Sequence, residues 1–234
     1  MNSFNKTSTA YSHALFTSLL FLVALVALTL GPLQGILTPA HAQTSQAERA
    51  NTVAAAQKQK LVITSDPLGG NYRATNGRKI DTVVVHYMSG INVEPSRWAD
   101  PKLNKSILKR YGVSAHYLVA RDGKVIQLVN EKNVAYHAGG SIMPAPDNRK
   151  NVNSFSIGIE TIATPKSGFT EAQYKSLALL ISDIKSRHNI RHLVGHDEIA
   201  GLRAVKMGLR KDAKPDPGPL FDWQRLHSLL QDVS

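Results

Sequence analysis

Leu193-Val194-Gly195-His196-Asp197-Glu198 and, after a basic stretch, Lys214-Pro215-Asp216-Pro217-Gly218-Pro219 are the parts of the sequence that decide its interpretation. His196 directly follows an apolar run that predicts a strand, and Asp216 lies between two prolines, whose rings restrict the backbone. Both side chains are therefore held stiffly. Imidazole and carboxylate are ligands of catalytic zinc, which normally takes three groups from the protein and a water as the fourth. The stretch predicts two of those three ligands.

The third ligand should come from another strand end. His86 closes the β-branched run Asp81-Thr82-Val83-Val84-Val85-His86, which is typical of a buried central strand. The sequence contains no cysteine, so thiolate ligands are excluded and a metal site must consist of histidine and carboxylate. We therefore expect one zinc ion (Zn2+) per chain, held by His86, His196 and Asp216, in a hydrolase.

Two further groups complete a hydrolytic site. Glu160 ends the apolar run 155–160, where a carboxylate is costly unless a cation, a bound water or several donors meet it. We interpret Glu160 as the general base and then acid; the alternative is a carboxylate that only orients a metal ligand. Lys214 is expected to stabilise the oxyanion of an amide or ester under attack. The alternative is that Lys214 is a surface lysine whose charge merely balances that of Asp216.

The apolar patterns predict one α/β (α+β) domain with a central mixed sheet, helices on both of its faces and the zinc site at strand ends. Asp122-Gly123 between two apolar runs is a strong hairpin signal. Thr170 with Gln173 three residues later predicts a capping box, and Asp222 is expected to cap the last helix. The expected strands are 61–64, 82–86, 114–120, 124–129, 155–160 and 191–194, and the expected helices are 102–111, 170–187 and a final one after residue 222.

A long irregular stretch, 136–154, is expected to form the rim of a substrate groove, since loops of this length in compact domains are usually functional or disordered. It contains His137, Ala138 and Gly139, which we predict to bind substrate; for His137 a purely structural role in the loop is the alternative. Gly158, inside an apolar run, predicts a close packing approach or a bulge. His116 is expected to be a packed strand residue.

The N-terminal segment has the marks of a cleaved secretory signal. Lys6 precedes an almost wholly apolar run, 14–30, and Ala40-His41-Ala42 supplies small residues at a cleavage site. A retained membrane anchor is the alternative, because the apolar run is close to the lower limit for spanning a bilayer. We expect a signal peptide over 1–42 that is cut after Ala42, a flexible lead over 43–60 and a catalytic domain over 61–234, in a periplasmic or secreted protein.

The net charge of +11, or +10 once Lys6 is removed with the signal, favours an anionic partner. Charge alone does not distinguish nucleic acid, anionic lipid and an acidic cell-wall polymer, and a merely soluble surface explains it equally well. We expect no nucleic-acid partner for an exported chain, no stable membrane span after cleavage, and a monomer.

Six short motifs stand in a particular order: Val85-His86; Ser114-Ala115-His116-Tyr117 with Asp122-Gly123; His137-Ala138-Gly139; Ser156-Ile157-Gly158-Ile159-Glu160; Gly195-His196-Asp197-Glu198-Ile199-Ala200; and Lys214-Pro215-Asp216-Pro217-Gly218-Pro219. In this order they resemble the type-2 N-acetylmuramoyl-L-alanine amidases, a family related to phage amidase lysozymes and peptidoglycan recognition proteins. The resemblance covers roughly residues 60 to 232. Each motif alone is weak, whereas the ordered set is specific.

The resemblance implies zinc-dependent hydrolysis of the amide between N-acetylmuramic acid and L-alanine in peptidoglycan or muropeptides. It implies His86, His196 and Asp216 as zinc ligands, Glu160 as the acid/base and Lys214 as the transition-state lysine. The other interpretation is a non-catalytic peptidoglycan-recognition protein with the same fold, although such a protein would usually lack a ligand. A generic metallopeptidase is disfavoured because the sequence has no His-Glu-x-x-His motif.

The sequence departs from the family in two places. The interval between His196 and Asp216 is about twice that of the close bacterial relatives, and the excess, 202–213, is rich in Arg and Lys. We expect this basic insertion to form an added lobe beside the zinc. Position 115, where the phage-type branch carries a catalytic tyrosine, is alanine, so we expect the chemistry to rely on Glu160 and not on Tyr117.

Overall fold

The computed structural model describes residues 60–233. The predicted signal peptide and nearly all of the predicted lead lie outside these residues. Among residues 60–233, no helix has both the length and the apolar character needed to cross a membrane.

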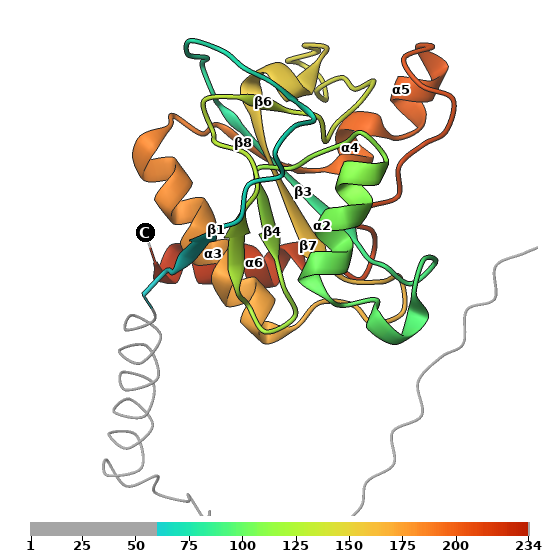
Figure 1. The fold of residues 1–234 in the computed structure, drawn as a ribbon. Helices are drawn as coiled ribbons and strands as arrows, with labels where there is room; N and C mark the ends of the chain where they lie inside the picture. The colour runs from blue at the N-terminus through green and yellow to red at the C-terminus, as the bar shows by residue number, and fades with distance from the viewer. Residues whose placement is uncertain (1–59, 234) are drawn as a thin grey trace, which may run out of the picture. The chain divides into compact units, whose positions relative to one another are not determined.

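A six-stranded mixed sheet forms the centre of the fold (Figure 1). Its neighbouring strands are parallel except for the β4–β5 pair, the predicted hairpin, which is antiparallel. A short two-stranded sheet of β2 (Tyr72–Arg73) and β6 (Val134–Ala135) lies apart from it. In spatial order the six strands are β1 (Ile63–Ser65), β5 (Val125–Gln127), β4 (Tyr117–Val119), β7 (Ser156–Ile162), β3 (Thr82–Met88) and β8 (His192–Gly195).

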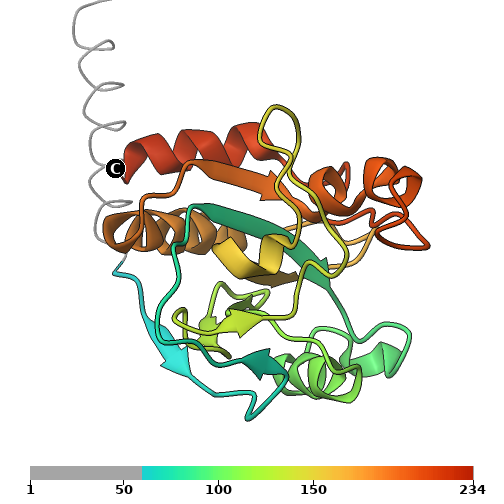
Figure 2. The same ribbon diagram turned by 90° about the horizontal axis from the view of Figure 1, so that it is seen from above.

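Helices cover both faces of this sheet, as predicted (Figures 1 and 2). One face carries α3 and α6, which pack against each other, and the opposite face carries α2. Two short helices, α4 and α5, follow β8 directly. The helices are α2 (Pro101–Arg110), α3 (Glu171–Arg187), α4 (His196–Ala200), α5 (Leu202–Lys206) and α6 (Trp223–Asp232), with single 3-10 turns at Pro95–Arg97 and Val152–Phe155.

Alternation along the central strands separates the two faces. In β3, Val83 and Val85 belong to the core beneath α3 and α6, whereas Val84 packs with the loop and α4 residues on the other side. His86 is two residues after Val84 in the same strand, so its side chain points to the same face, the one that the long loops cover. By the same alternation β7 sends Ile157 and Ile159 towards α3. The site residues thus share the face that the long loops cover.

The predicted helix starts are confirmed. Thr170 Oγ1 accepts from the Gln173 backbone N–H at 3.1 Å and the Gln173 side chain accepts from the Thr170 N–H at 3.0 Å, which is the predicted capping box. Asp222 accepts from the Arg225 N–H at 2.8 Å at the start of α6. Both caps satisfy backbone donors that have no partner inside the helix.

Strand limits differ from the prediction in detail. β3 and β7 continue two residues beyond His86 and Glu160, to Met88 and Ile162. β4 begins only at Tyr117, so His116 precedes the strand. The β-branched pattern does not show where pairing ends, because neighbouring strands decide that.

Candidate active site

Three predicted ligands meet in one cluster. His86 from β3, His196 at the start of α4 and Asp216 from the proline-rich loop are all buried, and one potential ligand atom from each lies within 4.8 Å of the others. Asp216 Oδ2 is 3.2 Å from His86 Nδ1 and 3.0 Å from His196 Nδ1. Ligands at a tetrahedral zinc with bonds of 2.0–2.1 Å are about 3.3 Å apart. The spacing therefore fits a zinc-sized cation.

The outer nitrogens of both histidines support this fit. His196 Nε2 lies 3.3 Å from the carbonyl oxygen of Ala138, which only accepts, so Nε2 carries the proton and the Nδ1 lone pair faces Asp216. His86 Nε2 lies 3.0 Å from His137 Nδ1. A ring proton held by an outer partner is the usual arrangement at metal-bound histidines.

Protonation states are also those of a metal site. Burial, and secondarily the neighbouring His196, lowers the pKa of His86 to about 4, so its imidazole is neutral at pH 7. Burial alone would raise the pKa of Asp216, but the adjacent His196 and His86 outweigh it and hold that pKa below its usual range. A carboxylate and neutral imidazoles are the forms that bind metal.

Glu160 lies beside this cluster because of strand register. In the parallel β3–β7 pair, His86 is the partner of Glu160, so the two side chains are neighbours on one face. Its Oε2 is shut off from solvent and has no hydrogen-bond partner among residues 60–233. Burial, and secondarily Asp216, raises the pKa of Glu160 to about 8, and Lys214 opposes the shift. A buried carboxyl with a free oxygen is suited to proton transfer.

A cavity of about 550 Å³ opens over the cluster. Glu160, His196 and Asp216 line it. The rest of its wall is mostly apolar and comes from the end of β3, from α2 and from the segments 111–114 and 136–139. Sequence reasoning predicted a helix over 102–111 but did not show that its apolar residues Ile107 and Leu108 contribute to this wall. The wall residues are Tyr87, Met88, Ile107, Leu108, Tyr111, Val113, Ser114, Tyr136, His137, Ala138 and Gly139.

Lys214 and Arg210 place two cations at the cavity. Lys214 is exposed, and its backbone N–H donates to the Ala200 carbonyl at 3.0 Å, which fixes the loop two residues before Asp216. Among residues 60–233, neither cation lies within 4.0 Å of a carboxylate. Sequence reasoning did not single out Arg210, because nothing in a basic run shows which cation faces a site.

The predicted substrate-binding residues occupy different environments. His137 and Ala138 are buried, whereas Gly139, with φ +57°, is exposed at the cavity. Asn153 Oδ1 accepts from the backbone N–H groups of His137 and Ala138 at 3.1 and 2.8 Å, so this segment is rigidly attached. The ring of His137 contacts His86, a placement that its sequence motif did not reveal.

The basic insertion folds against the same loop. Leu209 lies so close to Gly140 that a Cβ added there would be 1.9 Å from the Leu209 carbonyl oxygen. Arg203 in α5 donates to the Met143 carbonyl at 2.6 Å. Since Arg210 reaches the cavity, the insertion forms the expected lobe beside the cluster.

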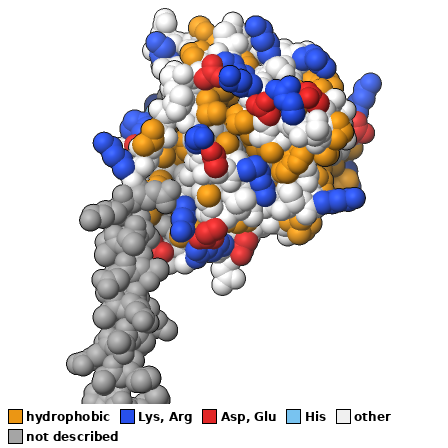
Figure 3. Space-filling model, turned by 60° about the horizontal axis from the view of Figure 1, so that its bottom comes forward, with side chains coloured by type: hydrophobic (Ala, Val, Ile, Leu, Met, Phe, Trp, Pro, Cys, Tyr) orange, Lys and Arg blue, Asp and Glu red, His pale blue; other side chains and the backbone are white. Residues whose placement is uncertain are grey.

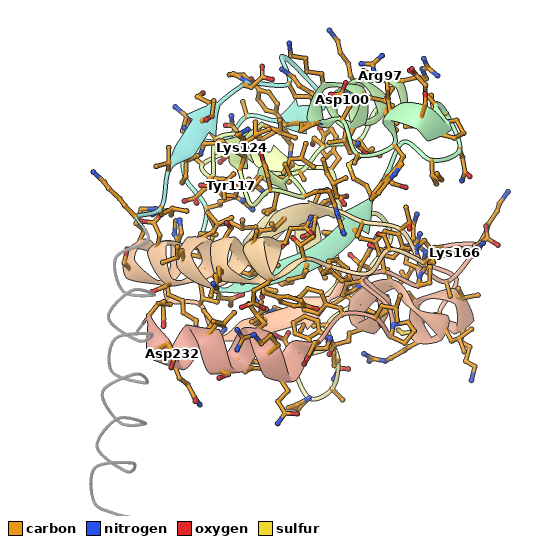
Figure 4. The ribbon with its side chains drawn as sticks, turned by 90° about the horizontal axis from the view of Figure 1, so that it is seen from below. Arg97, Asp100, Tyr117, Lys124, Lys166 and Asp232 are labelled. Atoms are coloured by element: carbon orange, nitrogen blue, oxygen red, sulfur yellow. The ribbon has the colours of Figure 1, made fainter. Side chains whose placement is uncertain are left out.

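His116 and Tyr117 have structural roles. His116 Nδ1 accepts from the Gly158 N–H at 3.0 Å, and its Nε2 lies 3.1 Å from the Asn133 carbonyl, so the ring joins two segments. Tyr117, labelled in Figure 4, belongs to the core on the α3 side of the sheet, and its hydroxyl donates to Glu131 at 2.6 Å. Tyr117 therefore does not replace the missing tyrosine at position 115.

Comparison with known proteins agrees with this geometry. Residues 76–219 match the family described as N-acetylmuramoyl-L-alanine amidase. The 1,6-anhydro-N-acetylmuramyl-L-alanine amidase AmpD of Enterobacter cloacae is 38% identical over 124 residues, which are 52% of this chain and 59% of that protein. The chain thus spans less than two thirds of this relative's length.

Solved structures share the fold. A crystal structure of a selenomethionine derivative of AmpD is 30% identical with a TM-score of 0.58, covering 74% of this chain and 96% of that one. The AmpDh3 protein of Pseudomonas aeruginosa, in complex with an anhydromuramic pentapeptide, is 26% identical with a TM-score of 0.50 and covers 69% and 64% of the two chains. Both the matched family and the fold are those that the ordered motifs resemble.

Proposed function

The chain belongs to the N-acetylmuramoyl-L-alanine amidase family, and from this membership we propose that it hydrolyses the amide between N-acetylmuramic acid and L-alanine in peptidoglycan or muropeptides. The observation that carries the proposal is the arrangement of His86, His196 and Asp216 beside Glu160, three of which, Glu160, His196 and Asp216, line one cavity. Side chains that can bind a metal ion and a carboxylate that can accept a proton are the groups that metal-assisted amide hydrolysis requires.

His86, His196 and Asp216 would hold one zinc ion, each through the atom that faces the cluster. When bound there, zinc supplies a Lewis acid and lowers the pKa of a coordinated water to about 7. The neutral imidazole of His86 and the ionised carboxylate of Asp216 need no proton loss before they bind it.

Glu160 moves the proton. Its carboxylate takes a proton from the attacking water as the new bond to the carbonyl carbon forms, and returns it to the amide nitrogen as the C–N bond breaks. The products are the carboxylate of the muramic acid lactyl group and the free amine of L-alanine. With a pKa of about 8 Glu160 holds the proton well between the two steps, and positive charge from Lys214 and a bound cation favours its ionised form.

Lys214 stabilises the charge that develops on the carbonyl oxygen. Its side chain lines the cavity with Glu160 and Asp216, and no carboxylate of the described chain neutralises it. A positive charge near a forming oxyanion lowers the free energy of the transition state more than that of the bound substrate, and this difference lowers the barrier.

The cavity also suggests how the rest of the substrate is held. Its apolar wall suits the methyl groups and ring faces of a muropeptide, and Arg210 suits a carboxylate of the stem peptide. The names of the relatives favour anhydromuramyl fragments as substrates.

The test compares wild type with Glu160→Gln, measuring bound zinc by mass spectrometry and cleavage of purified muropeptides and of 1,6-anhydro-muropeptides. We expect one zinc per chain in both proteins and release of stem peptides by wild type alone. Bound zinc without cleavage of either substrate would favour a recognition protein with the same fold. Absence of zinc from wild type would contradict the metal site.

A separate proposal concerns export. The apolar run 14–30 and the following Ala40-His41-Ala42 support translocation to the periplasm or beyond and cleavage after Ala42. N-terminal sequencing of protein from cell fractions should begin at Gln43. A cytoplasmic chain that still carries Lys6 would contradict this proposal.

A further inference from the structure

The imidazole ring of His137 lies between a predicted metal ligand and the first residue of β7. His137 Nδ1 is 3.0 Å from His86 Nε2, and His137 Nε2 is 3.2 Å from Ser156 Oγ. Ser156 Oγ is in turn 2.7 Å from the Val152 carbonyl oxygen. These three contacts form a continuous buried chain that ends on the backbone.

The Val152 carbonyl, at the end of this series of hydrogen bonds, determines the direction of each of them. The Val152 carbonyl only accepts, so the single hydroxyl proton of Ser156 points to it. Ser156 Oγ can then only accept from His137, which places the proton of a neutral His137 ring on Nε2. Its Nδ1 is left as an acceptor, and His86 donates its Nε2 proton there.

This direction decides which nitrogen of His86 can bind a metal. With the proton held on Nε2, the Nδ1 lone pair points at the cluster, 3.2 Å from Asp216 Oδ2. The opposite tautomer would present a proton to the cluster in place of a lone pair. An outer acceptor that fixes the tautomer of a ligand histidine raises metal affinity.

The fold reserves a place for this ring. A Cβ added to Gly158 would lie 2.3 Å from the Cγ atom of His137, so the glycine leaves the space that the ring fills. Gly158 was expected to mark a close packing approach, and this contact is that approach. The backbone N–H of His137 is also held by Asn153. Position and orientation of the ring are thus both determined by the protein.

We propose that His137 is a positioning residue, which fixes the tautomer and orientation of His86 through the chain to Ser156 and the Val152 carbonyl. The inference rests on the proposed function, because it assumes that His86 binds zinc. It differs from the substrate contact expected from the sequence, since both nitrogens of His137 are already engaged by protein partners.

Zinc affinity tests the inference without reference to activity. We would measure the zinc Kd of the whole chain by competition with a chromophoric chelator for wild type, His137→Leu, His137→Gln and Tyr136→Phe. His137→Leu removes both hydrogen bonds and should weaken zinc binding by about 10–100-fold. A glutamine can accept from His86 with its oxygen and donate to Ser156 with its nitrogen, so His137→Gln should recover most of the loss. Tyr136, which is the exposed neighbour at the cavity, is the matched control and should leave the Kd unchanged.

An unchanged zinc Kd in His137→Leu, with an effect on KM alone, would overturn the inference and would indicate that His137 contacts the substrate. Should His137→Leu fail to fold, Ser156→Ala replaces it, because this small change leaves the ring in place and removes only its outer acceptor. We expect Ser156→Ala to weaken zinc binding severalfold, and an unchanged Kd again overturns the inference. Wild type that binds zinc but cleaves no muropeptide contradicts the proposed function alone, whereas wild type without zinc contradicts both.

Discussion

At the scale of single residues, chemistry at the site depends on which groups are buried and which stay exposed. Glu160, whose Oε2 is shut off from solvent, and the buried His86 have pKa values displaced from those in water, upwards for Glu160 and downwards for His86. Lys214 remains exposed at the cavity. Its side chain is therefore accessible to a substrate that enters the cavity.

Replacing Lys214 by methionine keeps the length of the side chain and removes its charge. We expect kcat to fall by about 10²–10³-fold, the usual effect of losing one oxyanion-stabilising group, with little change in zinc content. Lys211→Met is the matched control, since Lys211 is an exposed lysine of the same loop and does not line the cavity. Equal activities of the two variants in a steady-state assay would contradict the role of Lys214.

His116 should make stability depend on pH. Burial, aided by Arg78, lowers its pKa from 6.5 to about 3, so the folded protein keeps it neutral while the unfolded chain protonates it. The stabilisation is complete above pH 6.5 and is lost as pH falls from there towards 3, by about 1.4 kcal/mol per pH unit for one proton. We would measure the free energy of unfolding of metal-free protein in urea at several pH values. Between pH 3 and 6.5 it should depend on pH less steeply in His116→Gln than in wild type, by the amount that corresponds to one proton. If the unfolding free energies of wild type and His116→Gln depend equally on pH, His116 is not the source of this pH dependence.

At the scale of elements, the parallel β3–β7 pair is the feature that joins the metal cluster to the proton-transfer group. It sets His86 opposite Glu160 and Thr82 opposite Ser156 on the same strands. The proposed zinc ligand, the proposed base and Ser156, at the end of the His137 hydrogen-bond chain, are therefore held by the same pair of strands. The insertion 202–213 is held less directly, through its contact with Gly140.

Gly140→Ala tests whether the insertion helps to form the cavity. The new Cβ would meet the Leu209 carbonyl, so the insertion must shift and take Arg210 with it; such overpacking costs about 1–3 kcal/mol. We expect KM to rise roughly tenfold, which corresponds to about 1.4 kcal/mol of binding, while zinc content stays the same. Gly70→Ala is the control, because a Cβ there meets nothing within 4 Å. A wild-type KM in Gly140→Ala would show that the insertion does not contribute to binding.

At the scale of the whole molecule, three ligands that lie far apart in the sequence meet at one point, so a bound ion would link β3, α4 and the proline-rich loop. On the face shown in Figure 3, basic side chains are interspersed with acidic ones and with apolar surface. The net charge of +11 is therefore not concentrated on this face, and attraction to anionic wall material remains an expectation.

Removing zinc should destabilise the fold. Ligand at about 1,000 times its Kd contributes about 4 kcal/mol, which for a domain of this size corresponds to roughly 10 °C in Tm. Calorimetry with EDTA and then with added zinc should show this loss and its recovery. Asp216→Asn keeps the shape of the side chain but removes its charge, so its Tm should respond far less. A wild-type Tm that does not respond to zinc would contradict the metal site.

The sequence alone determined the type of the six strands and three helices that it predicted and the chemistry of the expected ligand set, because periodicity, capping residues and ligand types are local properties; the short elements β2, β6, α4 and α5 had no such signal. The capping box at Thr170, the hairpin at Asp122-Gly123 and the glycine at 158 are examples. The ordered motifs also indicated the family correctly, since their order reflects the whole chain.

Only the tertiary structure decided how these groups face one another. Strand register, which depends on pairing between distant segments, placed Glu160 beside His86. Packing of a long loop placed the His137 ring on Gly158 and against His86, and folding of the insertion brought Arg210 to the cavity. None of these contacts has a local signal, because each joins residues that are far apart in the chain and is stabilised by burial that exists only once the domain has folded.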